Sequence, residues 1–146
     1  MGLGINMKIY IASPFFSDRE REILTKTENI LRERGFDVFS PREHTVPEEE
    51  EGTSAWSRKI FAIDHQGIDW ADCLVMLYWG NYSDTGTAWE CGYAYAIGKP
   101  VLVVHLGDSS NLMVHEGSHS NLKSVTELKD YDFEAMPKSI YIGKMY

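Results

Sequence analysis

The sequence predicts a doubly wound α/β protein, in which a parallel sheet carries helices on both faces. Two observations predict this fold. Segments typical of strands alternate with segments typical of helices, and the expected strands, such as residues 101–105, are near-continuous apolar runs rather than apolar–polar alternations. A length of 146 residues with 43% hydrophobic residues fits one compact domain over residues 1–146.

The first elements follow from local signals. Residues 8–13 form a β-branched and aromatic run that ends at Pro14, which indicates a buried strand. Ser17 or Asp18 can cap the helix that follows, and Gly35 has the position of a glycine that ends a helix.

The remaining elements are predicted in the same way. Further strands are expected at 36–40, 73–79 and 101–105, and further helices at 54–71 and 85–97. Residues 107–139 give weaker signals, for a short helix near Asn111 and another at 124–128. The helix at 54–71 is expected to turn one face to the core, carrying Trp56, Ile60, Ile63, Gly67 and Ile68.

This topology predicts where a ligand binds. Ligands of doubly wound sheets lie beyond the carboxyl ends of the strands, so the loops at 13–17, 41–45 and 79–87 should converge on one cleft. Residues 41–52 hold two prolines and four consecutive glutamates, which indicates an irregular acidic loop whose glutamates are solvated.

Composition excludes several classes of function. Fourteen Lys and Arg against 22 Asp and Glu give a net charge of −8. The chain therefore lacks the positive field that attracts nucleic-acid polymers and anionic membranes. The longest apolar runs are far shorter than the roughly 20 residues that span a bilayer. We therefore expect no membrane or nucleic-acid partner, and a neutral or cationic small molecule as the substrate.

The cysteines and the amino terminus indicate the compartment. Cys73 and Cys91 lie in apolar surroundings, which favours reduced, buried thiols over a disulfide. No secretory signal is visible at the start, and residues 1–6 are expected to form a flexible tail. A cytoplasmic protein is predicted.

Two short motifs resemble metal or cofactor sites but lack the context that those sites need. His115 to His119 matches HExxH, yet Gly117 and Ser118 weaken the helix that must present both histidines to zinc. Gly2-Leu3-Gly4 precedes a strand rather than following one and has no third glycine at the right spacing. No metal and no cofactor are expected.

Acidic residues gather where the topology predicts the cleft. Asp84 follows a strand, Glu90 falls in the first turns of the next helix, and Asp64 lies on or beside the apolar stripe of its helix. An ionised carboxylate on an apolar face is costly unless it is paired or used in chemistry. Tyr10, in the first strand, can reach the same cleft. Three acids and a phenol suit glycosyl chemistry, in which one carboxylate attacks the sugar and another acid protonates the leaving group.

A structural interpretation competes with this one. Asp84 can act simply as a helix cap, Glu90 can favour the dipole of its helix, and Tyr10 can be a core residue.

The ordered motifs of the chain resemble those of the nucleoside 2-deoxyribosyltransferases. The resemblance covers nearly the whole chain and rests on KIYIASPF, FSPREH, residues 61–72, DTGTAWECGYA, GKPVLVV, Asn111-Leu112-Met113 and the end at Tyr146. It implies a flavodoxin-like fold, exchange of the 2-deoxyribosyl group between nucleobases, and a homohexamer built as a trimer of dimers. Deoxynucleosides and free nucleobases are then the implied partners.

The resemblance also implies roles for individual residues. Glu90 matches the nucleophile that attacks the anomeric carbon, and Tyr10 resembles the tyrosine that orients it. Asp64 matches the acid beside the base, and Asp84 the acid that holds the sugar hydroxyls.

Further positions are implied around these acids. Asn111 and Met113 resemble residues that a neighbouring subunit supplies, and the terminal carboxylate of Tyr146 resembles a group that reaches into the site. Candidates from the residues themselves complete the set: Phe15 and Phe16 for stacking on the base, and Glu43 or His44 for touching the base or ordering its loop.

Two other functions are weighed against this one. A related enzyme that hydrolyses deoxynucleoside 5′-monophosphates needs donors for the phosphate, whereas Asp84 would repel it. A non-catalytic nucleotide-binding module of the same fold would place Asp64, Asp84 and Glu90 on separate surfaces.

Overall fold

The computed structural model describes residues 6–146, so most of the expected tail at 1–6 lies outside the described residues. The helices are α1 (Asp18–Glu33), α2 (Ser54–Trp70), α3 (Thr85–Ala96) and α4 (Leu112–Glu116). The strands are β1 (Lys8–Ala12), β2 (Asp37–Phe39), β3 (Cys73–Tyr78), β4 (Val101–His105), β5 (Ser109–Ser110), β6 (Ser120–Leu122) and β7 (Lys144–Met145). Short 3₁₀ helices occupy Pro41–Glu43, Gly80–Tyr82 and Val125–Lys129.

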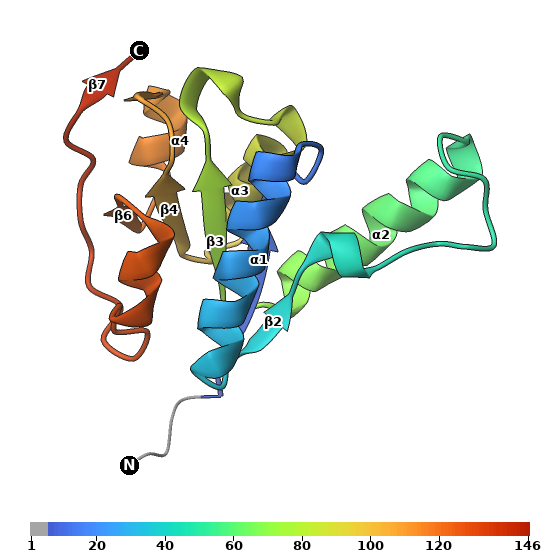
Figure 1. The fold of residues 1–146 in the computed structure, drawn as a ribbon, viewed down its shortest axis with the longest axis horizontal. Helices are drawn as coiled ribbons and strands as arrows, with labels where there is room; N and C mark the ends of the chain where they lie inside the picture. Colours follow the sequence, from blue (N-terminus) through green and yellow to red (C-terminus); the bar gives the residue numbers. More distant parts are fainter. Residues whose placement is uncertain (1–5) are drawn as a thin grey trace.

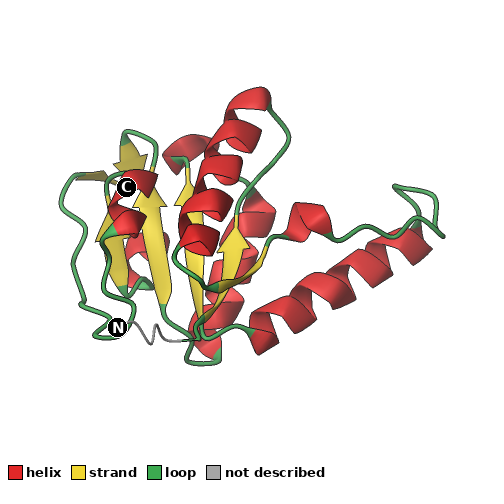
Figure 2. Cartoon of the chain, turned by 60° about the horizontal axis from the view of Figure 1, so that its bottom comes forward, coloured by secondary structure: helices red, strands yellow, loops and turns green. Residues whose placement is uncertain are grey.

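Five strands form the central sheet in the order β2-β1-β3-β4-β6, and every pairing in it is parallel. This order reverses direction between β1 and β3, as in flavodoxin-like folds. Figures 1 and 2 show the sheet between its covering helices. The predicted doubly wound α/β fold is therefore confirmed.

The strands divide their side chains between two apolar cores. Ile9 and Ile11 of β1 face the core that α1 covers, and Tyr10 and Ala12 face the core that α2 and α3 cover. Side chains alternate between the faces of a strand, so the same division recurs along β3 and β4. Burial on both faces explains why these strands are continuous apolar runs.

Three strands were not expected from the sequence. β6 completes the central sheet beside β4, while β5 and β7 pair in a small separate sheet. Each has two or three residues, and their short sequences carry no apolar run that would mark a strand. The expectation of a short helix near Asn111 is confirmed by α4, and that for 124–128 by the 3₁₀ helix there.

The predicted buried stripe of α2 is wrong over its first half. Gly67 and Ile68 are buried, but Trp56, Ile60 and Ile63 are partly exposed. The reason is visible in Figure 1, where α2 meets the sheet with its C-terminal half and extends away from it toward the loop at 44–53. Its apolar N-terminal half therefore lines a cleft instead of the core.

The HExxH sequence is divided between two structural roles. α4 ends at Glu116, and Nδ1 of His115 hydrogen-bonds with the Ser110 hydroxyl at 2.8 Å. Nε2 of His119 hydrogen-bonds with the carbonyl oxygen of Met136 at 2.7 Å.

Both cysteines, which lie in the described part of the chain, have free thiols. Within residues 6–146, no helix combines the length and apolarity that a membrane span requires.

Candidate active site

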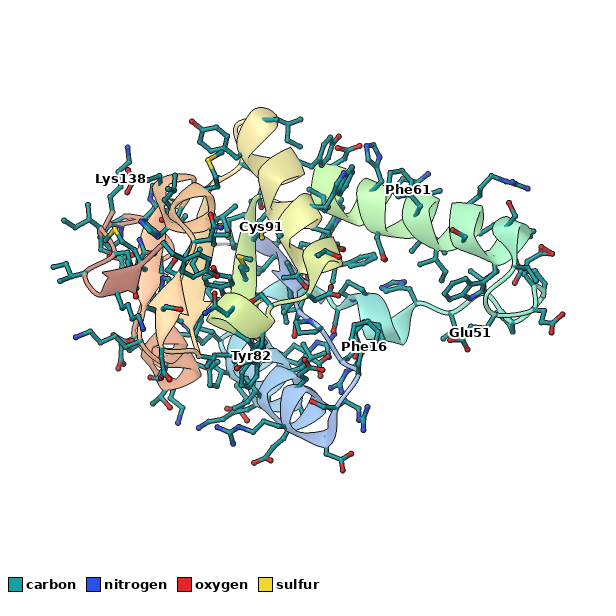
Figure 3. All side chains as sticks on the ribbon, turned by 90° about the horizontal axis from the view of Figure 1, so that it is seen from above. Phe16, Glu51, Phe61, Tyr82, Cys91 and Lys138 are labelled. Carbon is teal, nitrogen blue, oxygen red and sulfur yellow. The ribbon has the colours of Figure 1, made fainter. Side chains whose placement is uncertain are left out.

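A cleft of about 960 Å³ opens at the carboxyl ends of β1, β2 and β3. The predicted convergence of the three loops is confirmed, because residues 13, 15–16, 41–42, 44–47 and 84–86 all contribute to its walls. The first turns of α3 close one side, and the N-terminal half of α2 forms another. Phe16 and Glu51, labelled in Figure 3, mark the loop after β1 and the loop before α2 that border the cleft.

Glu90 lies in this cleft and accepts a hydrogen bond from the Tyr10 hydroxyl. The two side chains come from α3 and β1, 80 positions apart in sequence. Burial raises the pKa of Glu90 to about 8; the Tyr10 hydrogen bond works against this shift, and the charges of Asp64 and Asp84 add to it. Burial, followed by the charge of Glu90, holds the pKa of Tyr10 far above its usual range, so Tyr10 stays a donor.

Asp64 projects from α2 into the same cleft. Burial raises the pKa of its carboxyl to about 6, so it can hold a proton close to neutral pH. Its position follows from the helix: Ile60 and Ile68, one turn to either side, line the cleft with it. Two acids with raised pKa values therefore share one concave site, a combination typical of acid–base chemistry.

Asp84 lines the cleft wall and also begins a helix. It is the N-cap of α3, where its carboxylate accepts hydrogen bonds from the Thr87 amide at 2.9 Å and the Thr87 hydroxyl at 3.1 Å. The prediction that Asp84 caps the helix is thus confirmed. Asp84 lines the cleft as well.

Comparisons with known proteins show the family of the chain. Residues 9–123 match the family model described as nucleoside 2-deoxyribosyltransferase. The chain belongs to the nucleoside 2-deoxyribosyltransferase family. Members of this family are pentosyltransferases that act on deoxynucleosides and nucleobases.

Individual relatives extend the likeness. The chain is 40% identical to a 2-deoxyribosyltransferase of Bacillus psychrosaccharolyticus whose structure superposes with a TM-score of 0.87, covering 92% of this chain and 99% of that one. It is 27% identical over 153 aligned positions to a nucleoside deoxyribosyltransferase of Lactobacillus leichmannii, covering 94% and 97% of the two chains. A Lactobacillus johnsonii nucleoside deoxyribosyltransferase is 33% identical over 95 residues, 62% of this chain and 63% of that protein's own length.

Aromatic rings and one loop complete the walls of this deoxyribosyltransferase-family cleft. Phe15 and Phe16 both line it and stack with ring centroids 5.4 Å apart. His44 also lines it, stacked on Phe39 at 4.0 Å. Glu43 lies outside the lining and pairs with Arg32 of α1, which lowers the pKa of its carboxyl. Of the two roles considered for Glu43, ordering the loop is the one that this ion pair fits.

Three predicted site residues lie away from the cleft of their own chain. Asn111 caps α4 by accepting a hydrogen bond from the Met113 amide, and the Met113 side chain is 76% exposed. Tyr146 is partly exposed and joins β5 through a hydrogen bond from its amide to the Ser110 carbonyl. The cleft lining contains none of the three.

Sequence reasoning missed Arg42, which lines the cleft and anchors its loop to α1. Its Nε donates to the buried Glu28 carboxylate at 2.9 Å, and its Nη2 donates to the same carboxylate and to the Thr25 hydroxyl. The partners are 14 and 17 positions apart, so no local pattern joins them.

An aromatic cluster on α2 and α3 was also missed. Phe61 and Trp89 line the cleft with centroids 5.4 Å apart, and Trp89 stacks on Tyr93 at 5.6 Å. His65 packs against Tyr93 at 4.7 Å. Phe61 and His65 are four positions apart on α2, and Trp89 and Tyr93 are four positions apart on α3. This spacing was a usable signal in the sequence. Phe61, labelled in Figure 3, is 55% exposed, and Trp89 is 50% exposed.

Proposed function

We propose that the protein exchanges the 2-deoxyribosyl group of a deoxynucleoside between nucleobases, by double displacement through a covalent intermediate on Glu90. The observation that carries the proposal is the convergence of the Tyr10–Glu90 pair and the acid Asp64 on one cleft. Membership of the nucleoside 2-deoxyribosyltransferase family supports the same reaction.

In the first displacement, the ionised Glu90 carboxylate attacks C1′ of the donor. The C1′–N bond breaks, its electron pair goes to the base nitrogen, and Asp64 gives that nitrogen its proton. General-acid help of this kind is typically worth about 10²- to 10⁴-fold in rate. The products are a free base and a deoxyribosyl ester of Glu90 with inverted configuration.

In the second displacement, a ring nitrogen of another base attacks C1′ of the ester. The C1′–O bond breaks, Glu90 regains its negative charge, and Asp64 regains the proton that the attacking nitrogen loses. Two inversions give net retention at C1′. No 2′-hydroxyl withdraws electrons from the sugar, so positive charge develops there easily, and Glu90 stabilises it.

Binding uses the two ends of the cleft. Asp84 has a second oxygen beyond the one that caps α3, and we assign it to the 5′-hydroxyl of the sugar. The Phe15–Phe16 pair and His44 provide flat faces for the base. The acids that line the cleft, with Glu49 and Glu51 at its rim, disfavour a 5′-phosphate, so nucleosides rather than nucleotides are the proposed donors.

We further propose a homohexamer in which a neighbouring subunit completes each cleft. The exposed Met113, with Asn111 beside it and the Tyr146 carboxylate, would enter the neighbour's site. Exposed aromatic surface at Phe61 and Trp89 supports an interface on α2 and α3, since such patches are typical of protein contacts. A cleft shared in this way limits the access of water and favours transfer over hydrolysis.

The biological role that fits this reaction is salvage of nucleosides inside the cell. Base exchange converts an available deoxynucleoside into a scarce one without consuming the sugar. The free thiols of Cys73 and Cys91 suit a reducing cytoplasm.

The test is to mix a deoxynucleoside with a second base and measure the exchanged nucleoside by chromatography. We expect exchange by the wild type and none by Glu90→Ala, while the exposed Glu116→Ala control behaves as wild type. Trapping with a 2-fluoro deoxynucleoside should add the sugar mass to Glu90. An active Glu90→Ala variant would remove the mechanism.

Two further arms separate the alternatives. Thymidine should serve as donor and its 5′-monophosphate should not; release of base from the monophosphate alone would favour a nucleotide glycosidase. A wild-type protein that binds nucleosides but neither exchanges nor releases the base would instead favour a binding module.

A further inference from the structure

Phe39 packs directly behind the Tyr10 side chain. The two residues are partners in the register of β1 with β2, and their rings stack with centroids 5.2 Å apart at an interplanar angle of 11°. Neighbouring parallel strands place such residues on the same face of the sheet, here the face toward α2. The Phe39 ring therefore covers one face of the Tyr10 ring, on the side toward the edge strand β2.

Gly67 of α2 leaves the space that the Phe39 ring occupies. A Cβ atom at this position would lie 2.9 Å from two carbons of that ring and 3.0 Å from a third. Gly67 is not among the glycines with positive φ, so its backbone does not require glycine, and glycine weakens a helix interior. The close approach of Phe39 is the structural reason for a glycine here. Figure 1 shows β2 beside the C-terminal half of α2, where this contact forms.

The other ring against Phe39 belongs to the cleft. His44 stacks on it with centroids 4.0 Å apart at an interplanar angle of 5°, and His44 lines the cleft at the loop after β2. Phe39 thus joins two parts of the site, the base-side loop through His44 and the nucleophile through Tyr10.

We infer that Phe39 is a positioning residue, which holds the Tyr10 ring so that its hydroxyl points at Glu90, with Gly67 providing the room for Phe39. The inference rests on the proposed function for its kinetic consequence, but the geometry it describes exists without substrate. Phe39 itself is absent from the cleft lining, so it acts through Tyr10.

Positioning of Tyr10 has a measurable effect on Glu90. The hydrogen bond from Tyr10 lowers the pKa of Glu90, against burial and the charges of Asp64 on α2 and Asp84 at the start of α3, which raise it. Loosening the Tyr10 ring should therefore move the pKa of Glu90 upward.

Two variants and one control test the inference. Phe39→Leu removes the stacked ring, and Gly67→Ala keeps the ring but displaces it. Phe36→Leu is the matched control, because Phe36 is a buried aromatic residue in the core on the opposite face, packed against Phe133. The carboxyl carbons are observed by NMR in protein labelled with ¹³C at glutamate, and Glu90→Gln assigns the signal.

We expect both test variants to raise the pKa of Glu90 and to lower kcat about tenfold with KM within about twofold, while the control changes neither. The alkaline limb of the pH–rate profile should move up with the pKa. If Phe39→Leu does not fold, Gly67→Ala carries the test. A Glu90 titration that matches the control in the folded variant would overturn the inference. A wild type without exchange activity would overturn the proposed function instead, since the titration does not depend on turnover.

Discussion

Glu90 and Asp64 differ in how firmly each holds a proton. Burial raises both pKa values, to about 8 for Glu90 and to about 6 for Asp64. Below pH 6 both groups are protonated and the nucleophile is neutral; above pH 8 both are ionised and the acid has no proton to give. Between these limits the pair holds one proton, mainly on Glu90, and the active form under the proposed mechanism is the tautomer that carries this proton on Asp64 and leaves Glu90 ionised.

The pH dependence of kcat/KM follows from this pair. We expect a bell-shaped profile with its maximum near pH 7, and limbs that follow the pKa values of about 6 and about 8. Asp64→Asn should remove the alkaline limb and lower the rate most for donors whose base must be protonated to leave. A rate that still increases well above pH 9 in steady-state assays would contradict the assignment of a protonated Asp64.

Residues on helices and at their caps could be predicted from the sequence better than residues in irregular loops. Asp64, Asp84 and Glu90 were expected in one cleft, since helix periodicity and the parallel topology fix where they point. Glu43 was not placed, because its partner Arg32 lies on another element and ion pairs between distant segments leave no periodic signal. Met113 and Tyr146 remain predictions, because a single chain does not contain the neighbour that they would contact.

At the scale of elements, the start of α3 joins stability to substrate binding. Asp84 both caps the helix and lines the cleft. Asp84→Ala should destabilise the protein by about 1 kcal/mol through the lost cap. The same change should raise KM for the deoxynucleoside about tenfold through the lost hydroxyl contact.

Asparagine at this position separates the two effects. Asp84→Asn keeps a capping side chain, so we expect urea denaturation to give a wild-type midpoint while KM still increases. Equal loss of stability in both variants would show that the charge, rather than the cap, stabilises α3.

The loop after β2 is anchored to α1 by two ion pairs of different burial. The Glu28 side chain is 4% exposed against Arg42, whereas Arg32 and Glu43 are each 40% exposed. Removing one partner of a buried pair leaves an uncompensated charge and costs about 3–5 kcal/mol. An exposed pair contributes about 0–1 kcal/mol.

Arg42→Met should therefore lower the free energy of unfolding by about 3 kcal/mol and weaken base binding. Arg32→Met, the matched control, should change it by less than about 1 kcal/mol. Chemical denaturation measures both. Similar losses in the two variants would mean that burial of Glu28 does not decide the strength of its pair.

Some helices and strands could be predicted from the sequence better than others. The long helices and the apolar strands were expected within one or two residues of their observed ends, because periodicity and capping residues mark them. β5, β6 and β7 carried no such mark, since their pairing partners rather than their own residues make them strands. The buried stripe of α2 was wrong because periodicity identifies an apolar face but not what covers it.

At the scale of the whole molecule, a shared site predicts complementation between inactive subunits. Glu90→Ala lacks the nucleophile, and Met113→Glu places a charge in the neighbour's acidic cleft, so each should be inactive as a homo-oligomer. Subunits of the two kinds, mixed and reassociated, should regain exchange activity, because some clefts then combine an intact Glu90 with an intact Met113. Activity that stays absent in verified mixed oligomers, or full activity of Met113→Glu alone, would exclude a contribution from the neighbour.

The outward course of α2 has a consequence for how this protein diverges. Its C-terminal half is held by the sheet and carries Asp64, whereas its first two turns border the cleft without supporting the core. Under the proposed reaction, substitutions in those turns would reshape the space offered to the incoming base while Asp64 and Glu90 keep their places. The proposed reaction would then place base selection and proton transfer on separate stretches of one helix, so that the first could change without the second.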